Sequence, residues 1–205
     1  DPHIARTRLL ALENTWHGRA LPLDYLRSAH ALARAHGLGM HLDGARLFNA
    51  ALACQVPPRE IARHFDTVSI CLSKGLGAPV GSVLVGSHAL IDKARRWRKV
   101  CGGGWRQAGI LAAAGLFALD HHVERLAQDH ARAARLADRL REIPGIDLLG
   151  QHTNMVFINV PAEQLRALDA YLRDAGIRIS IGYLPTLRLV THLDIDDGGI
   201  ERTVA

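Results

Sequence analysis

The chain has 205 residues, of which 48% are hydrophobic and 22% charged, a composition that excludes a disordered or fibrous protein and is typical of a globular one. No apolar run in the sequence approaches the ~20 residues that a membrane-spanning helix needs, so we expect no membrane partner. The formal charge of +5 is spread along the chain, and we expect no nucleic-acid partner.

The first part of the chain alternates between short apolar runs and helical patterns. We predict strands at residues 9–13, 40–42, 67–72 and 83–85. Helices are predicted between Pro22 and Gly37 and over residues 46–54, where Pro57-Pro58 close the second one. This strand–helix–strand order predicts a largely parallel sheet covered by helices.

The pattern changes in the second part. Residues 106–142 are rich in Ala and Leu and contain no proline, which predicts one long helix or two successive helices. Short strands are then predicted at 146–149, 155–160, 177–180 and 187–190, around one helix near 162–174. We therefore predict two domains, residues 1–128 and a small α+β domain of residues 129–205.

The cysteines indicate the compartment. Cys54, Cys71 and Cys101 are far apart and odd in number, and no CxxC pair exists. This pattern favours neither a zinc site nor a disulfide framework, and the histidines show no metal-ligand spacing. We expect reduced thiols, a cytoplasmic location and no bound metal.

Two motifs follow predicted strands, where ligands bind in open α/β sheets. The second is SKGLG at residues 73–77, and it contains Lys74, one of three lysines in an arginine-rich chain. A lysine at a strand end can condense with an aldehyde as a Schiff base. A phosphate-binding P-loop is excluded, because the glycines follow the lysine. An ordinary loop lysine is the alternative.

The first motif is DGAR at residues 43–46. A carboxylate at Asp43 would keep a pyridine nitrogen protonated, so that the ring acts as an electron sink; a simple turn residue is the alternative. If the segment turns helically, Arg46 shares a face with Asp43 and lies near the phenolic oxygen of the ring. The alternative for Arg46 is a local ion pair with Asp43.

Five segments, in this order, closely resemble the low-specificity threonine aldolases, and the resemblance covers essentially the whole chain. They are LENT (12–15), HLDGARLFNA (41–50), CLSKGLGAPVGS (71–82), GGGWRQ (102–107) and LRLVTHLD (187–194).

The resemblance implies the aspartate-aminotransferase-like fold of fold-type I enzymes: a mostly parallel sheet flanked by helices plus a small C-terminal α+β domain. Residues 1–128 would be the remainder of the large domain that binds pyridoxal 5'-phosphate. The resemblance assigns the Schiff base to Lys74 and the ring nitrogen to Asp43. It places Ser73 beside the cofactor, and Arg46 by the ring oxygen and the substrate carboxylate.

Two further arginines enter through the resemblance. Arg188 resembles the family's carboxylate-binding arginine, and strand alternation places it on the face opposite Leu187 and Leu189; an outward surface arginine is the alternative. Arg106, after three glycines, is implied to reach the phosphate of a partner subunit. The implied assembly is a homo-oligomer, a tetramer built as a dimer of dimers that share active sites.

The chain departs from the family pattern twice. Trp16 stands where the family usually has His, and His17 follows it. The family's N-terminal third, which holds the residue stacked on the ring and much of the phosphate cup, has no counterpart. Since the chain lacks an initial Met and enters a predicted strand almost at once, we expect it to begin partway into a larger protein.

The implied reaction is retro-aldol cleavage of L-threonine or L-allo-threonine to glycine and an aldehyde. Two alternatives stay open at this point. One is another reaction on the same fold, β-elimination or transamination, because motifs locate a cofactor better than they choose the broken bond. The other is a non-catalytic domain, for example a nucleic-acid binder that uses the basic cluster at residues 95–99.

Overall fold

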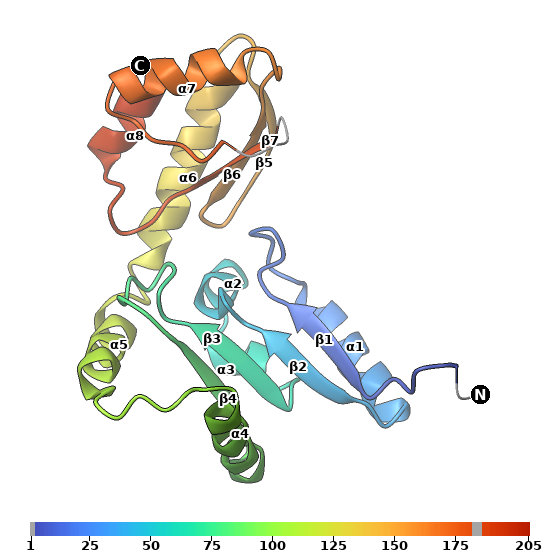
Figure 1. Ribbon diagram of the computed structural model, residues 1–205. Helices are drawn as coiled ribbons and strands as arrows, with labels where there is room; N and C mark the ends of the chain where they lie inside the picture. Colours follow the sequence, from blue (N-terminus) through green and yellow to red (C-terminus); the bar gives the residue numbers. More distant parts are fainter. Residues whose placement is uncertain (1–2, 182–185) are drawn as a thin grey trace. The chain divides into compact units, whose positions relative to one another are not determined.

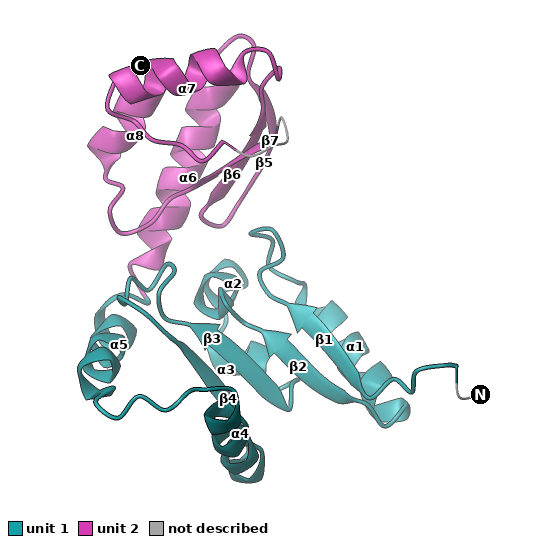
Figure 2. Cartoon of the chain, in the orientation of Figure 1, with its two compact units in different colours: residues 1–123 teal, residues 124–205 magenta. Residues whose placement is uncertain are grey.

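The computed structural model describes residues 3–181 and 186–205. They form two compact units, residues 1–123 and 124–205 (Figure 2). The boundary predicted after residue 128 falls inside the first helix of the second unit, α6 (Leu126–Arg141). Each unit has a sheet and a core of its own.

Unit 1 is built on a four-stranded sheet of order β1-β2-β3-β4 (Figure 1). Strands β1 (Leu9–Glu13), β2 (Gly39–Asp43) and β3 (Thr67–Cys71) run parallel. Strand β4 (Ser82–Gly86) is antiparallel to β3, because a short loop rather than a helical crossover joins the two. The sheet is thus largely parallel, as predicted, with one antiparallel edge strand.

Helices α1 (Leu23–Ala35), α2 (Leu47–Ala53) and α3 (Pro58–Ala62) cover one face of this sheet. Leu42 of β2 and Val68 of β3 supply the strand side of the core. The sequence predicted that Pro57-Pro58 only close the helix before them. In the structure Pro58 also begins a new helix, α3, because proline suits the first turn of a helix. After β4 come α4 (His88–Val100) and α5 (Gly109–His121).

Unit 2 has a three-stranded antiparallel sheet of order β5-β6-β7. The strands are β5 (Asp147–His152), β6 (Met155–Asn159) and β7 (Thr186–Val190). Helices α6, α7 (Leu165–Asp174) and α8 (Asp197–Val204) pack on it. Their apolar side chains form one core with Val156, Ile158 and Leu187 of the sheet.

Unit 2 differs from the sequence prediction in two places. The strand expected at 177–180 is irregular chain, because the N–H of Ile177 donates to the carbonyl of Leu172 at 2.7 Å and so ends α7. Helix α8 was not predicted, since its Gly198-Gly199 pair hides the helical pattern. Its start is nevertheless capped by Asp196, whose Oδ1 accepts from the N–H of Gly199 at 2.6 Å.

Across the two described stretches of the chain, the helices are all too short or too polar to cross a membrane.

Candidate functional site at the carboxyl edge of the unit 1 sheet

The carboxyl ends of β1, β2 and β3 share one edge of the sheet, because the three strands are parallel. Asp43 is the last residue of β2 and pairs with Ser69 of β3. Ser73 and Lys74 follow the end of β3 directly. The structure therefore brings four predicted site residues to this edge: Asp43, Arg46, Ser73 and Lys74.

The loop that carries Lys74 is folded on itself. The N–H of Gly77 donates to the carbonyl of Lys74, and the N–H of Ala78 to that of Leu72, both at 2.9 Å. Leu72 and Leu76 are buried and fasten the loop to the protein, whereas Lys74 is exposed. A defined loop with buried anchors thus presents the amine at the sheet edge.

Asp43 is held by a turn. The N–H of Ala45 donates to its Oδ1 at 3.0 Å, which leaves Oδ2 for a ligand. Gly44 permits the turn because a Cβ there would lie 2.9 Å from the carbonyl oxygen of Ser69 and 3.0 Å from Val68 Cγ1. Asp43 is therefore a turn residue, as the alternative interpretation of the sequence held. Its carboxylate also lies at the carboxyl edge of the sheet.

The helical turn that would give Asp43 and Arg46 a common face is not formed. Asp43 belongs to β2, and α2 begins only at Leu47, with Arg46 as its half-buried N-terminal cap. The two residues thus share no helical face, because the N–H of Leu47 bonds the carbonyl of Gly44 and closes a tighter turn. Arg46 still lies at the same edge.

Two site candidates were missed from the sequence, Asn14 and Thr15. They follow β1 and expose 0% and 2% of their surface. Asn14 Oδ1 accepts from the N–H of Leu21 at 3.1 Å, but Asn14 Nδ2 and Thr15 Oγ1 have no partner among the described residues. The sequence feature that could have identified them is a polar pair directly after a predicted strand, at the strand ends where ligands bind in open α/β sheets.

The donor set of this edge fits pyridoxal phosphate. Lys74 offers an amine for an aldehyde, and Asp43 offers a carboxylate for a ring nitrogen. Buried polar groups without a partner cost stability, so Asn14 Nδ2 and Thr15 Oγ1 are suited to a polar ligand. The backbone of Asn14 lies next to that of Asp43, since the N–H of Asn14 donates to the carbonyl of Asp43 at 2.9 Å.

Cys71 lies beside the lysine loop. Burial alone would raise the pKa of its thiol, but hydrogen bonds with Ser73, the positive charge of Lys74 and a hydrogen bond with Ser82 together lower that pKa below its usual value. The Cys71 Sγ lies 3.4 Å from the Ser73 Oγ. The Ser73 hydroxyl is therefore hydrogen-bonded to Cys71, the last residue of β3.

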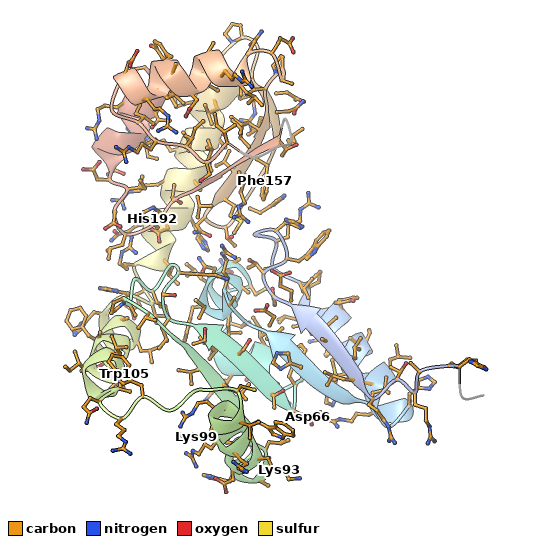
Figure 3. All side chains as sticks on the ribbon, in the orientation of Figure 1. Asp66, Lys93, Lys99, Trp105, Phe157 and His192 are labelled. Carbon is orange, nitrogen blue, oxygen red and sulfur yellow. The ribbon has the colours of Figure 1, made fainter. Side chains whose placement is uncertain are left out.

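Arg106 is placed differently. Helix α5 contacts the lysine loop at its C-terminal end, where His122 Nδ1 donates to the carbonyl of Leu76 at 2.6 Å. Arg106 precedes the other end of α5, roughly 18 Å of helix away, on the segment where Figure 3 labels Trp105. Within this chain, α5 does not bring Arg106 to the Lys74 edge.

Arg188 lies in unit 2, on β7. Leu187 before it is 1% exposed and belongs to the core, while Arg188 is exposed. The predicted alternation along this strand is confirmed. Arg188 pairs with Phe157 of β6.

Trp16 occupies a tight turn after Thr15. Its N–H and carbonyl pair with those of Arg19 at 2.9 Å, with His17 and Gly18 at positive φ between them. The Trp16 and His17 rings meet edge to face at 4.8 Å. His17 thus directly follows Trp16, the position where the family usually has His, and its backbone is left-handed.

No cluster of three or more His, Cys, Asp or Glu side chains suited to a metal ion occurs within residues 3–181 and 186–205.

Comparison with known families gives one family match. The model described as beta-eliminating lyase matches residues 1–163. The low specificity L-threonine aldolase of Escherichia coli (strain K12) is 50% identical over 195 residues, which cover 95% of this chain and 58% of that protein. The low-specificity L-threonine aldolase 1 of Arabidopsis thaliana is 41% identical over 210 residues, covering 97% of this chain and 58% of that protein.

The chain therefore spans about three fifths of the length of these relatives. Their identity confirms the resemblance to threonine aldolases that the motifs predicted. Among solved structures, a threonine aldolase of Leishmania major matches with a TM-score of 0.78 at 23% identity, covering 100% of this chain and 61% of that one. This likeness confirms the predicted fold-type I α/β architecture.

Proposed function

The chain belongs to the beta-eliminating lyase family, and from that premise we propose that it takes part in pyridoxal-phosphate-dependent cleavage of L-threonine or L-allo-threonine to glycine and an aldehyde. The observation that carries the proposal is the placement of Lys74 and Asp43 at one sheet edge. That edge belongs to a chain 50% identical to a threonine aldolase.

The residues of the edge divide the binding task. Lys74 would hold the cofactor covalently through Nζ, and Asp43 would pair with the ring nitrogen. Ser73 and Arg46 would contact the cofactor, Arg46 on the side of the ring oxygen. Arg106 would supply a cation to the phosphate of a cofactor bound by a partner subunit.

The bound cofactor supplies an electron sink for the pair released when a bond to the substrate's α-carbon breaks. Arg188 and Arg46 bind the substrate carboxylate; a guanidinium can do so through two parallel hydrogen bonds, which fixes the orientation of the α-carbon. Transfer of the β-hydroxyl proton to a base would let the Cα–Cβ bond break, so that the aldehyde leaves and the electron pair of that bond passes to the cofactor. Asp43 would favour the protonated form of the ring nitrogen. Return of the proton to the α-carbon would then yield glycine.

The test is covalent trapping of the cofactor. The cofactor-loaded protein is reduced with borohydride and digested, and the peptides are weighed by mass spectrometry. We expect a pyridoxyl group on Lys74, absent from Lys74→Ala and retained in Lys93→Ala, a control in the exposed helix α4. A trapped cofactor in Lys74→Ala would overturn the proposal.

A second candidate reaction is β-elimination, favoured by the description of the matching family. Both reactions use the same cofactor edge but break different bonds. Incubation with L-threonine separates them, because cleavage releases acetaldehyde and glycine whereas elimination releases ammonia and a keto acid. Release of ammonia without acetaldehyde would identify the reaction as β-elimination.

We further propose that the protein assembles as a homotetramer, a dimer of dimers, and acts in the cytoplasm. Helix α5 supports the assembly: it is apolar on all sides, yet Ile110, Leu116 and Phe117 are 80%, 62% and 56% exposed, and such a helix is normally covered. Light scattering of the purified protein tests the tetramer, and a monomer would contradict it. The three free cysteines support the cytoplasm, which cell fractionation tests.

A further inference from the structure

A group of buried polar residues lies in unit 2 where the end of β7 meets α6. Asp129, Asn154 and Thr191 expose 0%, 3% and 2% of their surface. Polar groups are costly to bury unless they are hydrogen-bonded, so the bonds that they make here hold specific elements together.

Thr191 is the centre of this group. Its Oγ1 donates to the carbonyl of Asp129 in α6 at 2.6 Å and lies 3.3 Å from the carbonyl of Asn154. Its N–H donates to the carbonyl of Asn154 at 3.0 Å, and Asn154 Nδ2 donates to the carbonyl of Thr191 at 2.8 Å. One residue thus fastens the end of β7 both to the residue before β6 and to α6.

The α6 side of this contact is itself braced. The buried Asp129 carboxylate forms a two-pronged ion pair with Arg125, the N-terminal cap of α6, at 2.5 and 3.3 Å. The pair is almost fully removed from solvent, with 12% of the Arg125 side chain exposed. Thr191 therefore binds a carbonyl in a turn whose side chains are fixed.

Strand β7 needs such an anchor because it is an edge strand, paired only with β6 among the described strands. Leu187 secures it in the core at 1% exposure, and Thr191 secures its end. Arg188 lies between these two fixed points and faces away from the core. Figure 3 labels Phe157, its partner in β6, and His192, which follows Thr191.

We propose that Thr191 is a positioning residue for Arg188: its hydroxyl ties β7 to α6 and so holds the Arg188 guanidinium in place for the substrate carboxylate. The inference rests on the proposed function, in which Arg188 binds that carboxylate. It deepens that function by adding a buried residue that acts through Arg188.

The test compares Thr191→Val, which removes only the hydroxyl, with Thr191→Ser, which retains it. Thr203→Val is the matched control, because the Thr203 Oγ1 donates to the carbonyl of Gly199 at 2.8 Å in α8 of the same unit. The dissociation constant of glycine is measured by absorbance titration of the cofactor-loaded protein, together with that of the cofactor. Hydrogen–deuterium exchange of residues 186–190 is recorded on the same proteins.

We expect Thr191→Val to bind glycine about 10-fold more weakly, the order of loss that a small misplacement of a binding group causes. Its cofactor affinity should stay unchanged, and β7 should exchange faster. Thr191→Ser and Thr203→Val should bind glycine like the parent protein, although Thr203→Val loses a similar hydrogen bond. Glycine affinity in Thr191→Val equal to that in Thr203→Val would overturn the inference.

Arg188→Gln separates this result from failure of the proposed function. If Arg188→Gln binds glycine as tightly as the parent, the assignment of Arg188 fails, and the positioning role fails with it. If Arg188→Gln binds weakly while Thr191→Val binds normally, only the positioning role fails. If the chain takes up no cofactor, the proposed function fails for this chain, and unchanged exchange of residues 186–190 in Thr191→Val would also refute the anchor.

Discussion

The backbone N–H of Asn14 donates to the carbonyl oxygen of Asp43 at 2.9 Å, which joins the ends of β1 and β2 one residue beyond their paired strands. On the other side of β2, the N–H of Gly44 donates to the carbonyl of Ser69 at 2.8 Å. Asp43 is therefore held from both neighbouring strands. The position of its carboxylate depends on the sheet and not on a free loop.

This placement predicts the effect of Asp43→Asn. The amide oxygen of Asn can still accept from the N–H of Ala45, so the turn and the fold should survive. The negative charge is lost, however, and the ring nitrogen is no longer kept protonated. We expect covalent cofactor attachment at Lys74 to persist while cleavage of L-threonine falls by at least ~100-fold, the order of loss for one preorganised electrostatic partner. Trapping and acetaldehyde release are measured on the same samples, and undiminished cleavage would remove Asp43 from this role.

Asp66→Asn is the matched carboxylate control, at the amino end of the same sheet (Figure 3). Hydrogen bonds from Arg34 and from the N–H of Met40 hold the pKa of Asp66 below its usual value. Since its pKa is lower in the folded state, its contribution to stability is present at neutral pH and is lost as the pH falls through the folded pKa. We expect Asp66→Asn to lower the free energy of unfolding at pH 7, to flatten the acid branch of the stability curve and to spare cleavage. An acid branch as steep as the parent's would contradict this linkage.

A methyl group at Gly44 should disturb the site through the backbone. In Gly44→Ala the Cβ would lie 2.9 Å from the carbonyl oxygen of Ser69, so the two strand ends must separate. We expect a loss of about 1–3 kcal/mol in the free energy of unfolding, as for other overpacked positions, together with weaker cofactor binding. Gly109→Ala is the control, because no atom other than those of its chain neighbours and its own helix backbone lies within 4 Å of a Cβ at that position. It should be neutral or stabilising in chemical denaturation.

The sequence predicted the framework of this edge well, because its signals are local. The apolar runs before Asp43 and Ser73 are short and bounded by polar turn residues, and parallel strands place both motifs at one edge. Strand alternation likewise placed Arg188 on the face opposite the core. These inferences needed only residues near one another in the sequence.

What the sequence did not predict depends on particular hydrogen bonds, some of them between residues far apart in the chain. The irregular chain after α7 carries the alternating pattern of a strand, and only the bond from Ile177 to Leu172 shows that it ends a helix. The N–H of Asn14 bonds the carbonyl of Asp43 in the next strand of the sheet. The anchor of Thr191 on Asp129 joins residues 62 positions apart. No local pattern encodes such pairings.

Thr15→Val should have opposite effects with and without cofactor. Thr15 Oγ1 is buried and lacks a partner among the described residues, so replacing it by a methyl group removes an unsatisfied polar atom. Without cofactor, we expect the variant to be as stable as the parent or more stable. Its affinity for pyridoxal phosphate should fall by up to ~10-fold, because it loses a hydrogen bond from the hydroxyl to the cofactor, and one hydrogen bond is worth ~1 kcal/mol.

Thr67→Val provides the contrast, because the Thr67 Oγ1 is already hydrogen-bonded to His41 Nδ1 at 2.8 Å. It should lose about 1 kcal/mol of stability without changing cofactor affinity. Thermal unfolding and cofactor titration measure the two effects. If Thr15→Val destabilises the cofactor-free protein as much as Thr67→Val does, the Thr15 hydroxyl has a protein partner and is not a ligand group.

The cysteines should differ in reactivity, and Cys71 reports on Lys74. Burial raises the pKa of Cys54; in Cys71 burial acts in the same direction but is outweighed by Ser73, Lys74 and Ser82, so its pKa is lowered. Because the thiolate is the reactive form, iodoacetamide near pH 8 should alkylate Cys71 before Cys54, as followed by peptide mass spectrometry. Lys74→Ala removes a nearby positive charge and should slow alkylation of Cys71 several-fold while leaving Cys54 unchanged. Equal rates for Cys71 in the two proteins would mean that the lysine amine lies too far from the end of β3 to influence it, and would weaken the assignment of this edge as the cofactor site.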